Sequence, residues 1–330
     1  MRDIPPGRAD RARLHLLAAL AAAPLVARAQ TAFPSRPVTL IVPSAPGGAS
    51  DIAGRLIALH MSRQLGEPVI VENKVGASGM LAMAQLAKSA PDGYTIGLGA
   101  NSPLTTSPNL FRNPGYDPVT SFAPIGLITT SNFVLVVAPD SRVSSVKQLV
   151  EFAKARLGEL TFASSGVNGA IHLLSELFKI SAGIDALHVP FKGGTESSTA
   201  VMSGRIDYVF DAVTSVIGLI KAGKLKALAV PGSRRDAALP DVPTMAELGY
   251  PQVTTDIFFG LVVPARTPQP VLATLAAALK TTSADTAFKE ATLRSGAFPT
   301  YASPQEFQEL IVRENERWRA VIQRMGVVPQ

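Results

Sequence analysis

Two segments of the sequence place glycines and small hydroxyl side chains between an apolar run and a helical pattern. The first, Pro43-Ser44-Ala45-Pro46-Gly47-Gly48, follows the apolar run 38–42 and precedes a helix expected from about residue 50. Glycine lets a backbone approach a bound group without obstruction by a Cβ atom. The first turn of a helix offers unpaired N–H groups and the positive end of the helix dipole, which attract an anion. The segment lacks the lysine of a phosphate-binding loop, so a carboxylate fits it better than a triphosphate.

The second segment has the same design. Ser164-Ser165-Gly166-Val167-Asn168-Gly169 lies between the apolar run 160–163 and a helix expected from about residue 170. Parallel strands deliver such loops to the carboxyl edge of a sheet, where ligands of open α/β folds bind. Either loop alone could be an ordinary helix start, with Asp51 in a favourable first-turn position. Together they predict a ligand held from two sides.

Other chemical motifs fail on inspection. The segment 218–224 has the spacing of a phosphate loop, but Leu225 replaces the magnesium-binding hydroxyl. The chain has no cysteine, which excludes disulfides, thiolate zinc sites and a cysteine nucleophile. No histidine spacing fits a metal site, and no cofactor is expected. His172, on the helix after the second loop, is more typical of a structural or ligand-orienting residue than of a general base. We therefore predict no enzymatic activity.

The N-terminal 29 residues have the pattern of a secretory signal peptide. Four arginines precede Leu14, an uncharged apolar run covers residues 14–26, and Ala27-Arg28-Ala29 forms a cleavage site. Thirteen residues are too few to span about 30 Å of hydrocarbon as a helix. We expect export to the periplasm, cleavage after Ala29 and no stable membrane insertion.

Removal of this leader changes the charge argument. The full chain has 31 Lys and Arg against 25 Asp and Glu, a net charge of +6. Without residues 1–29 it has 26 basic and 23 acidic residues, a net charge of +3. No basic run remains, so nucleic acid is excluded as an expected partner.

The rest of the chain alternates short β-branched runs with helical patterns. Continuous apolar strands of this kind favour an α/β fold with a parallel sheet covered on both faces. The segment 100–124 is expected to be largely loop, and the C-terminal region largely helical, with Trp318 as a core residue. Strands are expected over 38–42, 69–72, 94–98, 133–137, 160–163, 207–210, 225–230 and 258–262, and helices near 50–65, 79–90, 145–156, 170–181, 195–203, 213–222, 268–294 and 303–325.

Two chain segments are expected to cross between domains. One lies near Ile128–Phe133, where a second strand–helix series begins, and the other near Gly249–Asp256. The predicted organisation is a signal peptide over 1–29, a discontinuous domain I over 30–128 and 256–330, and domain II over 129–255. A ligand cleft would then lie between the domains.

These segments, in this order, resemble the Bug receptors, the periplasmic substrate-binding proteins of tripartite tricarboxylate transporters. Each segment is a weak signal alone, but the series covers nearly the whole chain after the leader. The matching stretches are Arg36–Pro43, Pro46-Gly47-Gly48 with Asp51, Val71–Lys74, Pro91–Thr95, Tyr116-Asp117-Pro118, Phe122-Ala123-Pro124, His172-Leu173 with Glu176-Leu177-Phe178, Val189–Gly193, Lys221–Leu225 and Leu239–Thr244.

The resemblance implies a type II periplasmic-binding-protein fold, in which two α/β domains close on a small carboxylate. It also implies that backbone N–H groups, hydroxyls and bridging waters hold the carboxylate. Carried over by position, the ligand contacts would be Ser44, Ala45, Gly47, Gly48 and Asp51 in the first loop, Ser164, Ser165, Asn168 and Gly169 in the second, and Thr130 or Ser131 with Asp211 nearby.

The sequence departs from the family pattern at three of these places. Asn168 replaces a glycine, Gly169 stands where a hydroxyl is usual, and Ala212 replaces an asparagine after Asp211. These changes leave the identity of the ligand open. The role of Asp51 is open as well, because it would pair with the amino group of an amino-acid ligand or simply cap the helix.

The sequence predicts a monomeric periplasmic receptor for a small carboxylate, either an organic acid or an acidic amino acid. It would deliver its ligand to membrane transporter subunits or to a sensor kinase. The alternative is a secreted α/β enzyme acting on a carboxylic acid, with Ser164 or Ser165 as the nucleophile.

Overall fold

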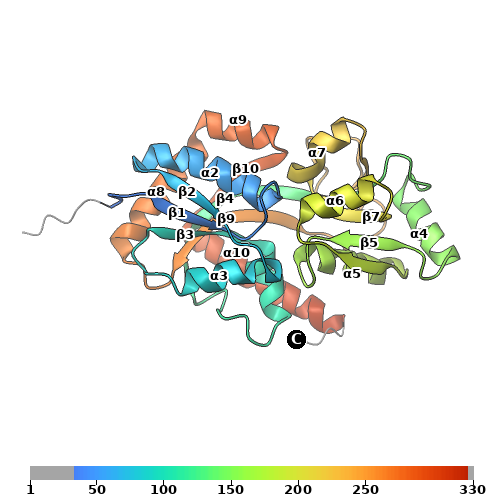
Figure 1. Cartoon of the computed structure of the whole chain (residues 1–330), viewed down its shortest axis with the longest axis horizontal. Helices are drawn as coiled ribbons and strands as arrows, with labels where there is room; N and C mark the ends of the chain where they lie inside the picture. The colour runs from blue at the N-terminus through green and yellow to red at the C-terminus, as the bar shows by residue number, and fades with distance from the viewer. Residues whose placement is uncertain (1–32, 326–330) are drawn as a thin grey trace, which may run out of the picture. The chain divides into compact units, whose positions relative to one another are not determined.

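The expected alternation of strands and helices is present in a computed structural model that describes residues 33–325 (Figure 1). The predicted signal peptide, residues 1–29, lies outside the described residues. The strands are β1 (Val38–Val42), β2 (Val69–Asn73), β3 (Thr95–Ala100), β4 (Phe122–Val137), β5 (Thr161–Ser164), β6 (Leu187–Pro190), β7 (Tyr208–Ala212), β8 (Lys226–Ala229), β9 (Asp256–Pro264) and β10 (Ala297–Ala302). The helices are α2 (Ala49–Leu65), α3 (Met80–Ala87), α4 (Val146–Ala155), α5 (Ala170–Ala182), α6 (Gly194–Met202), α7 (Val213–Lys221), α8 (Gln269–Ala284), α9 (Thr286–Arg294) and α10 (Pro304–Arg324), with the short helical turns η1 (Ala77–Gly79), η2 (Ser102–Thr106) and η3 (Ser107–Asn109).

The strands of residues 33–325 form one ten-stranded sheet with the order β2-β1-β3-β9-β4-β7-β5-β6. At one end β2, β1 and β3 are parallel, and at the other end β6, β5 and β7 are parallel. Between these groups, β9 and β4 pair in antiparallel fashion with their neighbours, while β8 and β10 pair only with β4. The sheet is therefore mixed. The prediction of a parallel sheet holds for the two outer groups and is wrong for the centre.

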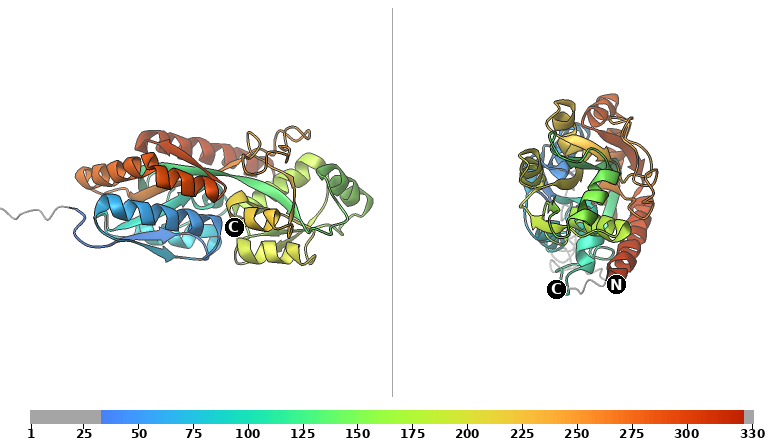
Figure 2. Two further views of the ribbon diagram at one scale, coloured as in Figure 1. Left: turned by 90° about the horizontal axis from the view of Figure 1, so that it is seen from above. Right: turned by 90° about the vertical axis from the view of Figure 1, so that its right-hand side faces the viewer.

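The long strand β4 connects the two groups of elements (Figure 2). Its first part, up to Asn132, pairs with β9, and its second part, from Phe133, pairs with β7. In Figure 1, α2, α3 and α8–α10 surround β1–β3, whereas α4–α7 surround β5–β7. One strand thus takes part in both halves of the fold.

Apolar side chains from the strands and the facing helices build the core. Val38, Leu40 and Val42 of β1 and Val134–Val137 of β4 are almost fully buried. Trp318 of α10 is 1% exposed, which confirms its prediction as a core residue. Helix α10 begins with a capping box, in which Ser303 and Glu306 satisfy each other's backbone N–H groups.

Several elements were absent from the predictions. Strand β10, strand β6 and the first half of β4 all fall in segments without a clear strand pattern. Strand β6 has an edge position, with Leu187 exposed, and β10 contains Pro299, so neither shows the continuous apolar run of a central strand. Part of the segment expected as loop forms η2 and η3.

Candidate functional site

The carboxyl ends of the parallel strands in both halves carry the two glycine-rich loops. Strand β1 leads through the first glycine-rich loop into α2, and β5 leads through the second into α5. Gly48 is the N-cap of α2 and Gly169 is the N-cap of α5, and neither helix has a side-chain cap. Both helix starts therefore present backbone N–H groups that can donate to an anion, and in α5 these follow Ala170, whose own N–H donates to Ser102 Oγ.

The first loop is shaped by the carboxylate of Asp51. Its oxygens accept hydrogen bonds from Gly47 N and from Asn73 Nδ2, both at 2.9 Å. Arg55 Nε lies 3.0 Å from the same carboxylate. Burial raises the pKa of Asp51, but the hydrogen bonds from Arg55, Gly47 and Asn73 outweigh it and hold the pKa below its ordinary value. Asp51 is thus an ionised, buried acceptor that fixes the turn of the loop.

The remaining residues of the first loop leave space around their backbone. Gly47 has φ +81°, a conformation that favours glycine. A Cβ atom at Gly48 would meet nothing closer than 3.5 Å, at the Ala45 carbonyl oxygen. The Ser44 hydroxyl donates to the neighbouring Ala45 carbonyl oxygen at 3.3 Å.

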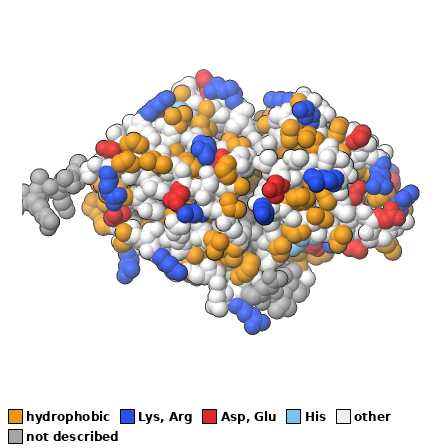
Figure 3. All heavy atoms as spheres, viewed as in Figure 1, with side chains coloured by type: hydrophobic (Ala, Val, Ile, Leu, Met, Phe, Trp, Pro, Cys, Tyr) orange, Lys and Arg blue, Asp and Glu red, His pale blue; other side chains and the backbone are white. Residues whose placement is uncertain are grey.

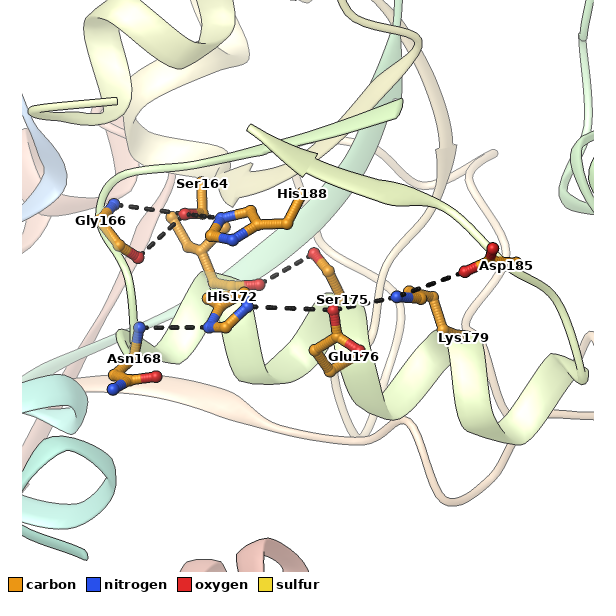
Figure 4. Close-up of polar contacts among 10 residues, drawn as sticks. Ser164, Gly166, Asn168, His172, Ser175, Glu176, Lys179, Asp185 and His188 are labelled. Atoms are coloured by element: carbon orange, nitrogen blue, oxygen red, sulfur yellow. Dashed lines mark hydrogen bonds and ion pairs between the residues drawn. The ribbon is translucent and has the colours of Figure 1, made fainter. Parts of the chain in front are cut away.

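The second loop is held by hydrogen bonds among its own residues and by two histidines (Figure 4). The Ser164 hydroxyl is fully buried, 2.9 Å from the Gly166 carbonyl oxygen and 2.7 Å from His188 Nε2. Asn168 N donates to His172 Nδ1 at 3.1 Å. Ser165 is half-exposed, in contrast to the buried Ser164.

Residues of the first half of the fold contact the second loop directly. Ser78 Oγ of η1 donates to the Val167 carbonyl oxygen at 2.8 Å. Ser102 Oγ of η2 accepts from Ala170 N at 2.9 Å, and Ser107 Oγ of η3 donates to the Asn168 carbonyl oxygen at 3.2 Å. The second loop is therefore hydrogen-bonded to η1, η2 and η3.

The first loop in turn faces the start of α6. A Cβ atom at Gly193 would lie 3.5 Å from the Ala45 side chain, and one at Gly47 would lie 3.5 Å from Thr195 Oγ1. The segment 191–195, which ends in the first turn of α6, thus lies beside the first loop in the region between the halves.

Sequence reasoning assigned no role in the site to Ser78, Ser102, Ser107, Thr195 or His188. The signal for Thr195 was a repeat of the strand–glycine–helix pattern at Gly193-Gly194. The three serines follow strands β2 and β3, but nothing local distinguishes them from surface serines.

The other predicted residues lie close by with different partners. Asp211, at the end of β7, is 2% exposed, and its carboxylate accepts from Ala212 N at 2.7 Å and from the Ser198 hydroxyl. Burial raises the pKa of Asp211 to about 6, against the opposing effect of these two hydrogen bonds. Thr130 Oγ1 pairs with Thr300 Oγ1 at 2.8 Å, and Ser131 Oγ lies 3.4 Å from the Gly296 carbonyl oxygen. These two hydroxyls therefore contact β10 and the residue preceding it rather than either glycine-rich loop.

Within residues 33–325, no group of three or more His, Asp or Glu side chains has the arrangement of a metal site. In the same part of the chain, no helix combines the length and apolar character needed to cross a membrane. On the face shown in Figure 3, basic and acidic side chains are interspersed.

Two α/β halves, joined by the shared strand β4 and with uncapped helix starts in the loops between them, define the class of the periplasmic binding proteins. The family model described as "Tripartite tricarboxylate transporter family receptor" matches residues 53–327. The chain therefore belongs to this family of transporter receptors, as its resemblance to the Bug receptors predicted.

Relatives and solved structures agree with this membership. Protein BugT of Bordetella pertussis is 33% identical over 89% of this chain and 90% of its own length. The structure of Rpa4515 from R. palustris with adipate has a TM-score of 0.87 and 32% identity, covering 90% of this chain and all of that one. MatC from Rhodopseudomonas palustris with bound malate has a TM-score of 0.84 and 30% identity, covering 88% and 100%. The type II fold expected from the sequence is thus confirmed at the level of a two-domain periplasmic-binding-protein fold.

Proposed function

We propose that this protein is a periplasmic receptor that captures a small carboxylate between its two halves. The observation that carries the proposal is a pair of helix starts without side-chain caps, at Gly48 and Gly169, in loops that each lie against the opposite half of the fold. Such helix starts bind anions through backbone N–H groups, without an arginine clamp. The similar structures that hold adipate and malate support a dicarboxylate as the first ligand class to test.

The proposed contacts fall into two sets. The backbone around Ala45, Gly47 and Gly48 and the hydroxyl of Ser44 would hold one side of the ligand. The half-exposed Ser165, Asn168 and the N-terminal N–H groups of α5 would hold the other side. In this proposal Asp51, Ser164 and Asp211 act by shaping the loops, because their polar atoms already have protein partners.

We further propose that the ligand is enclosed by a hinge motion between domain I (30–128 and 256–330) and domain II (129–255). The change of pairing partner in β4 between Asn132 and Phe133 supports a crossing at this place. The contacts of Ser78 and Ser107 with the second loop support a closed state. Hinge closure around a ligand is a common mode of domain motion.

We also propose that a leader is removed after Ala29 and that the mature chain is a monomer. It would deliver its ligand to membrane transporter subunits or to a sensor kinase. Binding without turnover is proposed as the whole activity. Ser164 would be a poor nucleophile, since it is fully buried and its single proton faces the Gly166 carbonyl oxygen.

A thermal-shift screen of the mature chain tests this function. The panel would contain malate, adipate, succinate, glutamate and benzoate, with glucose and lysine as controls. Ligands that bind the native state raise its melting temperature. A rise with at least one carboxylate, confirmed by calorimetry without product formation, is expected. Binding of none of them, or turnover that is lost in Ser165→Ala, would overturn the proposal.

A further inference from the structure

Two imidazole rings are stacked directly beneath the second loop (Figure 4). His172 of α5 and His188 of β6 have ring centroids 4.0 Å apart and planes inclined by 20°. The ring of Phe162 lies against His188 at 4.8 Å. Both histidines are half-buried, and each contacts a different residue of the loop.

The hydrogen bond at His172 fixes the protonation state of that ring. A backbone N–H can only donate, so Nδ1 of His172 must carry a lone pair to accept from Asn168 N. The proton of the neutral ring is then on Nε2, which faces Glu176 Oε1 at 3.9 Å. His172 is the third residue of α5, the position from which a glutamate reaches back to the chain in a capping box. The neutral imidazole of His172 reaches one residue further back, to the N–H of Asn168, which precedes the N-cap Gly169.

The residue held in this way is conformationally unusual. Asn168 has φ +60°, a left-handed conformation that non-glycine residues adopt at a cost. Its N–H is held by His172 and its carbonyl oxygen accepts from Ser107 Oγ at 3.2 Å. Figure 4 shows its carboxamide directed away from His172. The bond to His172 therefore helps to fix the backbone that precedes the α5 N-terminus.

The second histidine holds the other end of the loop. The Ser164 hydroxyl has one proton, and the Gly166 carbonyl oxygen can only accept it. His188 Nε2 is then the donor to Ser164 Oγ, at 2.7 Å.

The surroundings favour two neutral rings. Burial lowers the pKa of His172, an effect that Glu176 opposes and Lys179 reinforces. Burial, followed by His172 and Lys179, lowers the pKa of His188 to about 4. Two protonated rings at 4.0 Å would repel each other. The remaining titratable groups nearby are Asp185, which lies 3.9 Å from Lys179 Nζ, and Tyr208 of β7, whose pKa is raised by burial and by Glu176 and Asp207.

We propose that His172 is a positioning residue of the ligand site, whose neutral ring holds Asn168 in its left-handed conformation, so that carboxylate affinity falls when His172 is protonated. The inference rests on the proposed function, because it assigns a support to one of the proposed ligand loops. His188 assists by stacking on His172 and by holding Ser164.

Protonation of His172 has two opposite effects on an anionic ligand. It removes the acceptor of Asn168 N, which releases the loop, and it adds a positive charge near the carboxylate, which would strengthen binding. We expect the release of the loop to dominate, because an N–H facing a protonated Nδ1 is left without a partner. Affinity should therefore fall with decreasing pH, whereas a purely electrostatic histidine would make it rise.

The experiment compares wild type with His172→Asn by calorimetry from pH 7.5 to pH 5.0, with malate or adipate, whichever binds wild type more tightly. The Oδ1 of asparagine stands near the place of Nδ1, accepts the same hydrogen bond and does not titrate. The ratio of the two affinities cancels titration of the ligand itself. We expect wild type to lose affinity relative to His172→Asn by about threefold or more at pH 5.0, within the range for one hydrogen bond.

Two further variants complete the test. His172→Leu should bind about fivefold to tenfold more weakly at every pH, with a flat relative profile. His60→Gln changes a buried histidine of α2 that packs on Phe288 of α9. This variant should keep the pH dependence of affinity of the wild type. A constant ratio of wild type to His172→Asn, or affinity that rises on acidification, would overturn the inference while the proposed function stands. Failure of wild type to bind any carboxylate of the panel would overturn both.

Discussion

The hydroxyl of Ser78 lies 2.8 Å from the carbonyl oxygen of Val167, across 89 residues of sequence. Ser78 follows β2 in one half of the fold, and Val167 belongs to the loop after β5 in the other. The approach depends on glycines, because a Cβ atom at Gly169 or Gly166 would come within 3.1 or 3.3 Å of Ser78 Oγ. This hydrogen bond therefore joins the two halves of the fold.

Removal of this hydroxyl should weaken ligand binding. Ser78→Ala deletes the hydrogen bond to Val167, and we expect a loss of affinity of about threefold to tenfold, the range for a neutral hydrogen bond. Ser78 has φ +53°, so Ser78→Gly serves as a matched variant that also relieves the backbone strain. Calorimetry should give the same loss in both. Unchanged affinity in Ser78→Ala, which keeps the backbone strain and lacks only the hydroxyl, would contradict the role of this hydrogen bond.

The first loop predicts a steric test at Gly48. Gly48 has φ −77°, and a Cβ atom there would make only ordinary contacts, the nearest at 3.5 Å with the Ala45 carbonyl oxygen, so a larger residue can be accommodated without disturbing the fold. Gly48→Val should leave the melting temperature within about 2 °C and abolish carboxylate binding, because the side chain would cover the helix start. Gly218→Val, in α7, is a control for the same change outside the ligand loops, since a Cβ there meets nothing within 4 Å. Unchanged affinity in Gly48→Val would contradict the assignment of the first loop.

The two possible roles of Asp51 can be separated by choice of ligand. If Asp51 shapes the loop through Gly47 N and Asn73, Asp51→Ala weakens the binding of succinate and of glutamate alike. If Asp51 binds a ligand amino group, only the affinity for glutamate falls. The satisfied hydrogen bonds of its carboxylate favour an equal loss, of about tenfold or more, for every ligand of the panel that binds wild type. A loss confined to amino acids would refute the loop-shaping role.

The buried Asp211 predicts a pH-dependent effect on stability. Its pKa in the folded protein, about 6, lies above the ordinary value of 3.8, so the folded state binds the proton more tightly than the unfolded chain. This contribution to stability is fully present below about pH 4 and is lost as the pH rises through about 6. Asp211→Asn removes the penalty of burying the charge. Urea unfolding should show that Asp211→Asn gains stability relative to wild type, by about 1–2 kcal/mol, between pH 5 and pH 8. A stability difference between the two proteins that stays constant from pH 5 to pH 8 would show that Asp211 is ionised in both the folded and the unfolded state.

Local patterns in the sequence determined most of the elements and both glycine-rich loops. Helix α2 begins at Ala49 and α5 at Ala170, where a glycine ends the loop and an apolar periodicity begins. Strand β1 is an almost continuous apolar run, because it is covered on both faces. The class of fold and the anion-binding character of the loops follow from such features, since each depends on residues close together in the chain.

Pairing and contact between distant segments were decided only by the tertiary structure. The antiparallel centre of the sheet requires β9 to lie between β3 and β4, which no local pattern encodes. Ser78 bonds Val167 and Asn168 bonds Ser107, each across the two halves of the fold, while His172 reaches Asn168 from the first turn of α5. A serine or a histidine has the same local sequence signature on a surface as beside a ligand loop. Its role depends on which groups folding brings within hydrogen-bonding distance, and for His172 and His188 that was a stacked pair beneath the predicted site.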